Sequence, residues 1–224
     1  MNIYKHIQQL GATTFLLLSL CFLLIGSSYF ILGYKRVDMN LFFYCYRNPY
    51  LNMLFLNATK LAEASVTIFI LLVLFYYRNV YAITYLLIIL VVTILVFILK
   101  HHVFGYVRPV VYLQDHLEIR GVNNLPLLQN FSFPSGHTTF VFAGMCYLSI
   151  LVKKNWMQVI FFVLAILCAF SRVYLCQHFY IDIYVGALLG TMITCLMMFF
   201  LKEKWMQSTH PILSFSLKKY VESL

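Results

Sequence analysis

The stretch SRVYLCQHFYID, residues 171–182, places His178 and Asp182 four positions apart between two strongly apolar segments. On a helix, this spacing puts both side chains on one face. The carboxylate can then accept the proton of one ring nitrogen and leave the other nitrogen free as a nucleophile. A second histidine, His137, can act as the general acid that protonates a leaving oxygen. These residue types suit transfer of a phosphoryl group to His178, followed by attack of water on the phosphohistidine.

Three cations without an acidic neighbour in sequence, Lys100, Arg108 and Arg172, favour binding of an anion. The stretch PSGH, residues 134–137, is typical of a helix start, because proline suits the first turn and glycine lets a ligand approach the backbone. Free N–H groups at such a start bind phosphate, and arginine can pair with two phosphate oxygens at once. Together these groups predict a site for a doubly charged tetrahedral oxyanion.

The acidic residues argue against a metal site. Only seven occur, and apart from Asp115 and Glu118 they are widely scattered, without an HExxH or DxD cluster. Fixed cations and backbone N–H groups are therefore expected to offset the charge on the equatorial phosphate oxygens. The sequence predicts a metal-independent phosphatase that needs no cofactor.

Membrane helices must position these groups, because 62% of the 224 residues are hydrophobic, 10% are charged and the mean hydropathy is +0.86. A soluble domain of this size carries about a quarter charged residues. The sequence predicts an all-α, polytopic membrane protein of a single domain, residues 1–224, with a motif core at 100–182. A helix needs roughly 20 apolar residues to cross the bilayer. Six transmembrane helices are expected, at 11–34, 61–77, 79–99, 138–152, 155–171 and 183–201.

The number of spans decides on which side the polar clusters lie. With six spans, the segments after the third and the fifth share one face with the first loop, and both termini lie on the other face. A short segment after the first span, 38–55, mixes aromatic and polar residues and is expected at the interface. With Lys100, Arg108 and Arg172 set aside, the face that carries the termini holds more Lys and Arg. This excess favours cytoplasmic termini in a cell membrane and a site on its outer face.

Three groups of residues resemble the signature motifs of the type 2 phosphatidic acid phosphatase (PAP2) superfamily: Lys100…Arg108-Pro109, Pro134-Ser135-Gly136-His137 and Ser171-Arg172-x5-His178-x3-Asp182. This superfamily includes membrane lipid phosphatases and soluble vanadate-dependent haloperoxidases. The resemblance implies a six-span helical core with its site on the outer face. It implies His178 as nucleophile, Asp182 as its orienting partner and His137 as general acid. The implied phosphate ligands are Lys100, Arg108, Ser135, Gly136 and Arg172.

The first motif departs from the family pattern. Seven residues rather than the usual six separate Lys100 from Arg108-Pro109. Either the lysine reaches the phosphate through an extra residue or a bulge at the helix end, or its role is weaker. The first hundred residues match the family only in their hydrophobic layout.

A site at a membrane surface favours a substrate that is itself a membrane lipid. The resemblance offers phosphatidic acid, phosphatidylglycerol phosphate, undecaprenyl diphosphate and the phosphates of lipid A. The loop 110–133 is expected to cover the site and to shape this choice. No run of five or more Lys or Arg occurs, so nucleic-acid binding is not expected. The expected partners are the phosphorylated lipid and the bilayer, and the oligomeric state stays open.

Three alternatives use the same features differently. A lipid phosphotransferase would form the same phosphohistidine and pass the group to another lipid. A vanadium haloperoxidase shares the residues, but those relatives are soluble. A non-enzymatic membrane transporter or scaffold would not depend on the imidazole of His178.

Overall fold

A computed structural model describes residues 11–113, 122 and 125–222 of the chain. These residues form helices and no strands, as the composition predicts. In chain order the elements are α2 (Thr13–Ile31), α3 (Asp38–Cys45), α4 (Pro49–Thr59), η1 (Lys60–Ala62), α5 (Ala64–Tyr77), α6 (Asn79–Ile98), η2 (Leu99–Phe104), α7 (Pro109–Leu113), α8 (Gly136–Val152), α9 (Asn155–Tyr174), α10 (Tyr180–Met206), α11 (Pro211–Ser214) and α12 (Leu217–Glu222).

Four segments in the described part of the chain are long and apolar enough to cross a bilayer: Thr13–Ile31, Asn79–Phe104, Asn155–Tyr174 and Tyr180–Leu201. They correspond to the first, third, fifth and sixth predicted spans. The count rises to five if Pro49–Ala62 and Ala64–Tyr77, which are bent by 53° relative to each other, are taken as one span. Four or five candidate spans are thus found, and the count of six stays a prediction.

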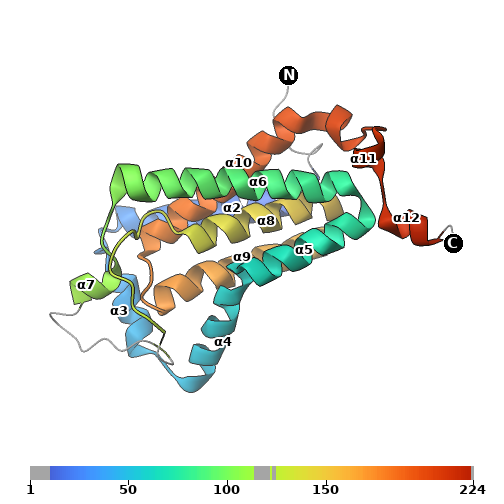
Figure 1. Ribbon diagram of the computed structural model, residues 1–224. Coiled ribbons are helices and arrows are strands. Elements are labelled where there is room, and N and C mark those ends of the chain that lie inside the picture. The colour runs from blue at the N-terminus through green and yellow to red at the C-terminus, as the bar shows by residue number, and fades with distance from the viewer. Residues whose placement is uncertain (1–10, 114–121, 123–124, 223–224) are drawn as a thin grey trace.

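The second predicted span, 61–77, differs from expectation because it starts at a bend. Glu63 has an extended backbone and separates η1 from α5. Before this bend the chain is also helical, in α4 and η1. Part of α4 belongs to the segment that was expected to lie at the interface. Figure 1 shows α4 leading away from the axis of α5 toward α3. The segment 38–55 thus contains α3 and part of α4, separated by the turn before Pro49.

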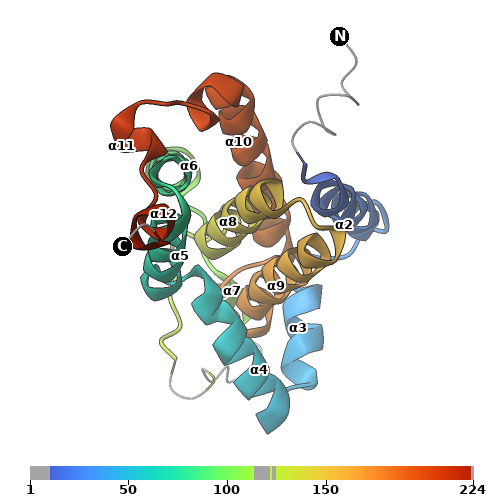
Figure 2. The ribbon, with the colours of Figure 1, turned by 90° about the vertical axis from the view of Figure 1, so that its right-hand side faces the viewer.

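The fourth predicted span is α8, which is short for a membrane helix. Its 17 residues cover about 25 Å at 1.5 Å per residue, less than the ~30 Å hydrocarbon core. In Figure 2, α8 lies in the middle of the bundle, and it packs against α6, α9 and α10. Most of its side chains are buried. Since its neighbours shield it from lipid, α8 can be shorter than the helices around it.

Two glycines let α10 approach α8 closely. A Cβ atom on Gly190 would lie 2.4 Å from the carbonyl oxygen of Thr139, and one on Gly186 would lie 3.0 Å from the carbonyl oxygen of Ser135. Side chains at these positions would separate the two helices. The start of α8 is therefore held directly against α10.

The three polar clusters lie at one end of the bundle. Figure 1 shows η2, α7, the start of α8 and the turn between α9 and α10 gathered at the same end. The opposite end holds the start of α2, where the Thr14 N–H donates to Oε1 of Gln158 in α9 at 3.0 Å. There too the Asn79 N–H donates to the carbonyl oxygen of Phe215, near α12. The chain ends, residues 1–10 and 223–224, lie outside the described residues, so the predicted membrane face of the termini stays a prediction. Part of the predicted covering loop, at 114–121 and 123–124, also lies outside them.

Candidate active site

The third motif is held in the turn between α9 and α10. The backbone N–H groups of Gln177 and His178 both donate to the carbonyl oxygen of Arg172, at 2.9 and 3.1 Å. His178 therefore precedes α10, which corrects the expectation that one helix carries both partners. Asp182 lies in the first turn of α10, and its Oδ2 accepts a hydrogen bond from the Phe179 N–H at 3.0 Å. Such a contact from the third helical residue to the N-cap stabilises a helix start.

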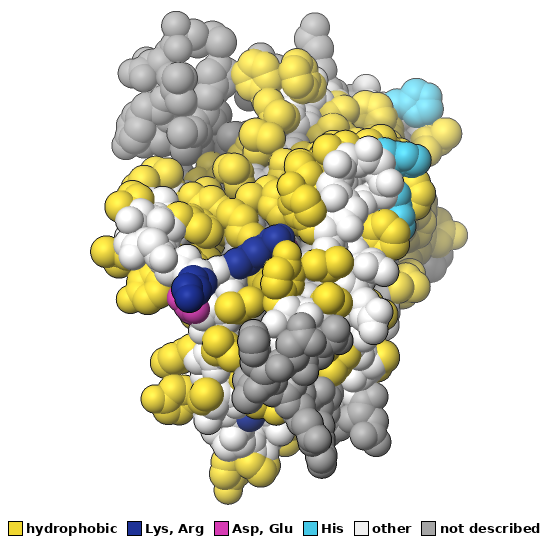
Figure 3. Space-filling view, turned by 90° about the vertical axis from the view of Figure 1, so that its left-hand side faces the viewer, with side chains coloured by type: hydrophobic (Ala, Val, Ile, Leu, Met, Phe, Trp, Pro, Cys, Tyr) yellow, Lys and Arg dark blue, Asp and Glu magenta, His cyan; other side chains and the backbone are white. Residues whose placement is uncertain are grey.

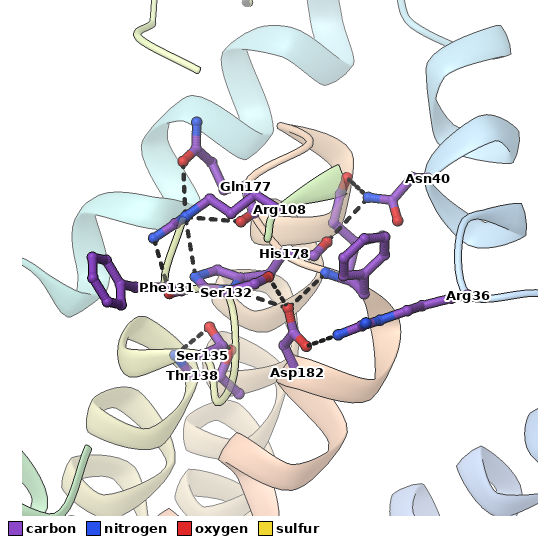
Figure 4. Close-up of polar contacts among 12 residues, drawn as sticks. Arg36, Asn40, Arg108, Phe131, Ser132, Ser135, Thr138, Gln177, His178 and Asp182 are labelled. Atoms are coloured by element: carbon purple, nitrogen blue, oxygen red, sulfur yellow. Dashed lines mark hydrogen bonds and ion pairs between the residues drawn. The ribbon is translucent and has the colours of Figure 1, made fainter. Parts of the chain in front are cut away.

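His178 and Asp182 nevertheless face each other. The Nδ1 atom of the ring lies 3.3 Å from Oδ2 of Asp182, and both side chains are buried. The same oxygen accepts a short hydrogen bond from the hydroxyl of Ser132, which comes from the segment before α8 (Figure 4). An imidazole whose Nδ1 faces a carboxylate presents Nε2 as its free nitrogen. The structure thus brings the two predicted partners together and points Nε2 away from the carboxylate.

Arg108 is buried beside the free nitrogen of the imidazole. Its Nη1 lies 3.5 Å from Nε2 of His178 and donates to the carbonyl oxygen and Oε1 of Gln177, at 2.8 and 3.1 Å. Its Nε donates to the carbonyl oxygen of Asn130 at 2.8 Å. Figure 4 shows the guanidinium fixed between these two segments. An oxyanion bound at Nε2 would therefore meet a cation whose position is already set.

The second motif forms the start of α8, as its sequence predicts, although Pro134 precedes the N-cap and does not lie in the first turn. Ser135 is the N-cap, and its hydroxyl oxygen faces the Thr138 N–H at 3.4 Å. The Ser135 N–H donates to the carbonyl oxygen of Asp182 at 3.0 Å. The motif is therefore tied to the residue that pairs with His178. Gly136 and His137 lie half-buried in the first turn of α8, where free N–H groups favour an anion.

The first motif contains a local change of helix type. Lys100 lies in η2, a π-helical turn that follows α6, and the Gly105 N–H donates to the Lys100 carbonyl oxygen five residues back, at 3.1 Å. An α-helix closes the same bond over four residues, so a π-helical turn accommodates an extra residue. The seven-residue spacing between Lys100 and Arg108 therefore coincides with a bulge at the helix end. The bulge that the first alternative assumes is therefore present, but contact of the half-buried lysine with a phosphate stays a prediction.

Arg172 is buried at the end of α9 and contacts a distant part of the chain. Its Nη1 donates to Oγ1 of Thr59, the last residue of α4, at 2.7 Å. Its Nε has no hydrogen-bond partner among the described residues. Because an unpaired donor on a buried cation is costly, this guanidinium is suited to donate hydrogen bonds to an oxyanion.

Charged groups from all three motifs affect the pKa of His178. The pKa of its imidazole lies well below the ordinary value, chiefly because burial disfavours the charged ring. Further contributions in the same direction come, in decreasing order, from Arg108, Lys100, Arg172 and His137. The neutral ring is therefore the stable form at neutral pH, as a nucleophile requires. Lys100 and His137 act on His178 through charge, without a hydrogen bond to it among the described residues.

Sequence reasoning missed several residues that contact this site. Ser132 and Gln177 lie beside or inside the motifs, so their polar side chains in apolar surroundings were a usable signal. Asn40, Thr59 and Arg36 come from the first sixty residues, where no motif marks them. Asn40 in α3 is fully buried and donates from Nδ2 to the carbonyl oxygens of Val173 and His178, both at 3.0 Å. Arg36, between α2 and α3, places Nη2 3.7 Å from Oδ1 of Asp182.

The bundle of apolar helices, with a histidine–aspartate pair and buried cations at one end, defines a class of membrane protein. The chain belongs to the PAP2 superfamily, because the model of that family matches residues 81–206, more than half of the chain. The matched region contains all three motifs. The resemblance seen in the sequence is therefore confirmed at the level of the family.

Solved structures share the fold. The crystal structure of Aquifex aeolicus LpxE is 29% identical, with a TM-score of 0.63, and the match covers 74% of this chain and 96% of that chain. The crystal structure of the first transmembrane PAP2 type phosphatidylglycerolphosphate phosphatase from Bacillus subtilis has a TM-score of 0.62. This match covers 82% of this chain and 94% of that chain, and its 23% identity shows the fold alone.

A curated relative matches a shorter region. The undecaprenyl-diphosphatase of Sulfolobus acidocaldarius is 37% identical over 71 residues, which are 32% of this chain and 34% of that protein. The chain spans less than half the length of the curated relatives that it matches.

Proposed function

We propose that this protein is a membrane-bound, metal-independent phosphatase that hydrolyses a phosphorylated lipid through a phosphohistidine intermediate. The observation that carries the proposal is the environment of His178. Its Nδ1 faces Asp182 at 3.3 Å, its Nε2 lies 3.5 Å from Arg108, and the ring is buried. Membership of the PAP2 superfamily supports the same chemistry.

In the first step, Nε2 of His178 attacks the phosphorus atom and forms a P–N bond. The P–O bond to the leaving oxygen breaks, and His137 donates a proton to that oxygen. A monoester then leaves as the lipid alcohol, and a diphosphate leaves as the lipid monophosphate. Asp182 accepts a hydrogen bond from the Nδ1–H group, which keeps its proton, and stabilises the positive charge on the substituted ring. The groups proposed to offset the charge on the equatorial oxygens are Lys100, Arg108, Ser135, Gly136 and Arg172.

In the second step, water attacks the phosphohistidine. His137 accepts a proton from that water, the P–N bond breaks, and inorganic phosphate leaves. The neutral imidazole of His178 is restored, and His137 again carries the proton that the next cycle needs. Bonds and protons balance over the two steps with His178, His137 and water alone. In this proposal the fixed cations, and not an added metal ion, offset the negative charge on the phosphate oxygens.

We propose that the substrate is a phosphorylated lipid whose tails stay in the bilayer while its phosphate enters the site. Candidates are phosphatidic acid, phosphatidylglycerol phosphate, undecaprenyl diphosphate and lipid A phosphates. The name of the Sulfolobus acidocaldarius relative, undecaprenyl-diphosphatase, makes a polyprenyl diphosphate the first compound to test. The Lys and Arg distribution supports a site on the outer face of the cell membrane, with cytoplasmic termini.

The test is a panel of these lipids, assayed with purified protein in detergent and in the presence of EDTA. Release of inorganic phosphate supports a hydrolase, whereas phosphate that appears on a second lipid supports the phosphotransferase alternative. We expect His178→Ala to abolish turnover. His210→Ala serves as the matched control, because His210 is an exposed histidine next to α11. Wild-type turnover by His178→Ala would refute the proposal, as would strict dependence on added Mg²⁺.

A further inference from the structure

The two oxygens of the Asp182 carboxylate have unequal surroundings. Oδ2 faces Nδ1 of His178 and also accepts hydrogen bonds from the Ser132 hydroxyl and the Phe179 N–H. Oδ1 is buried and accepts no hydrogen bond from the described residues. It faces the guanidinium of Arg36, with 3.7 Å between Oδ1 and Nη2. A buried carboxylate is costly without a counter-charge. Arg36 supplies this counter-charge at Oδ1, the oxygen that does not face His178.

Aromatic rings hold Arg36 in this position. Its guanidinium carbon lies 4.2 Å from the ring centroid of Phe179 and 5.3 Å from that of Tyr106, both within the ~6 Å range of cation–π contacts. The side chain also lines a cavity of about 450 Å³, whose walls come from the end of α2, η2, the segment before α8 and α10. These walls are almost entirely aromatic or aliphatic.

The cavity belongs to the end of the bundle that carries the motifs. Figure 3 looks onto that end and shows a few Lys or Arg side chains set in a largely hydrophobic surface. Apolar walls weaken screening by water, so the attraction between Arg36 and Asp182 is stronger than that of an exposed pair. It remains partly screened, since 34% of the Arg36 side chain is exposed.

In the proposed reaction, the ion pair between Arg36 and Asp182 would keep Asp182 ionised and oriented. The ring of His178 gains positive charge as the P–N bond forms, and Asp182 stabilises that charge only while it is ionised and presents Oδ2 to Nδ1. Arg36 favours ionisation by its charge, and its position at Oδ1 leaves Oδ2 for the ring. We propose that Arg36 is a positioning residue of the reaction that acts through Asp182, an inference that rests on the proposed role of His178.

The geometry does not favour Arg36 as a further phosphate ligand. Figure 4 shows Arg36 approaching Asp182 from one side, while Nε2 of His178, where the phosphorus would bond, faces Arg108 on the other. The two roles differ in kinetics. Loss of a ligand that binds substrate and transition state alike raises KM, whereas loss of a positioning residue lowers kcat.

The experiment compares Arg36→Gln and Arg36→Lys with Lys35→Gln. Lys35 is the matched control, since it is an adjacent, exposed cation whose side chain has no place in the site. We expect Arg36→Gln to lower kcat by about 10- to 100-fold, the loss that follows when a partner that orients a metal-ligating side chain is removed. KM should change by less than about twofold, because phosphate binding is intact. Arg36→Lys should recover most of kcat, and Lys35→Gln should match the wild type.

Single-turnover labelling and thermal unfolding complete the test. With lipid labelled in its phosphate, Arg36→Gln should slow formation of the phosphoenzyme, at a melting temperature close to that of Lys35→Gln. A wild-type kcat in Arg36→Gln, a rise in KM alone, or a loss of activity that only follows a loss of folded protein would overturn the role. If His178→Ala is inactive while Arg36→Gln is fully active, only this inference fails. If both variants are fully active, the proposed function fails.

Discussion

The contact between Thr59 and Arg172 tests whether the first sixty residues position the site. Oγ1 of Thr59 accepts a hydrogen bond from Nη1 of Arg172 at 2.7 Å, and both side chains are buried. Thr59→Val keeps the shape of the side chain and removes the acceptor. Nε of Arg172 already lacks a partner among the described residues, so the variant leaves a second donor of the same buried cation unpaired.

The size of the effect follows from this burial. A hydrogen bond to a charged group contributes about 1.5–3 kcal/mol, and each 1.4 kcal/mol corresponds to about a tenfold change. If Arg172 binds the phosphoryl group, as proposed, a guanidinium that is no longer held weakens both ground-state and transition-state binding. We therefore expect kcat/KM of Thr59→Val to fall by about 10- to 100-fold.

The assay is the initial rate of phosphate release from a lipid phosphate in detergent micelles, combined with thermal unfolding of each variant. Thr59→Ser is the control, because it retains the hydroxyl acceptor, and we expect it to keep most of kcat/KM. A wild-type kcat/KM in Thr59→Val would refute the reasoning. A lower melting temperature with full activity of the folded protein would show that the contact stabilises the fold without positioning Arg172.

Three further predictions follow from the same geometry. Because burial and nearby cations hold the pKa of His178 well below 6.5 in the free protein, the ring stays neutral as the pH falls through 6.5, and kcat/KM should be lost only at lower pH. An acidic limb of kcat/KM at 6.5 or above, measured with lipid well below KM, would contradict this. Ser132→Ala removes a hydrogen bond to Oδ2 of Asp182 and should lower kcat about tenfold, which the same assay measures. Gly190→Ala forces α10 from α8 and should cost about 1–3 kcal/mol of unfolding free energy, visible in the melting temperature.

The helical class and most helix positions could be predicted from the sequence. The charge-free runs in α2, α6, α9 and α10 are long enough to cross a bilayer, and PSGH marks the start of α8. The bend at Glu63 was not predictable in this way, whereas the short length of α8 was, since the fourth span was expected at 138–152. Hydropathy along a segment measures its composition and does not reveal which helix is enclosed by the others. Only the packing of α8 among its neighbours shows why 17 residues suffice there.

The candidate site was predictable where its chemistry is concentrated in short motifs. Spacing alone suggested that His178 and Asp182 are partners, although it wrongly placed both on one helix. The extra residue after Lys100 left two alternatives open, because sequence spacing does not distinguish an α-helical from a π-helical turn. Arg36, Asn40 and Thr59 could not be found, since they reach the site through packing of distant segments. Asn40, for example, contacts a carbonyl oxygen 138 positions away.

Residues before position 60 and residues from 100 to 182 contribute to the candidate site in different ways. The groups proposed to bind and transfer phosphate lie between Lys100 and Asp182, whereas several side chains before residue 60 hold different parts of the third motif, Arg36, Asn40 and Thr59 among them. Thr59 holds the guanidinium of Arg172, Asn40 holds two carbonyl oxygens of the turn, and Arg36 faces the carboxylate of Asp182. Since this turn also carries His178, the proposed nucleophile, a shift of α3 would move His178, and a shift of α4 would move Arg172, a proposed phosphate ligand. Substitutions at Arg36, Asn40 and Thr59 should therefore change the rate of phosphoryl transfer even though no motif residue is itself substituted.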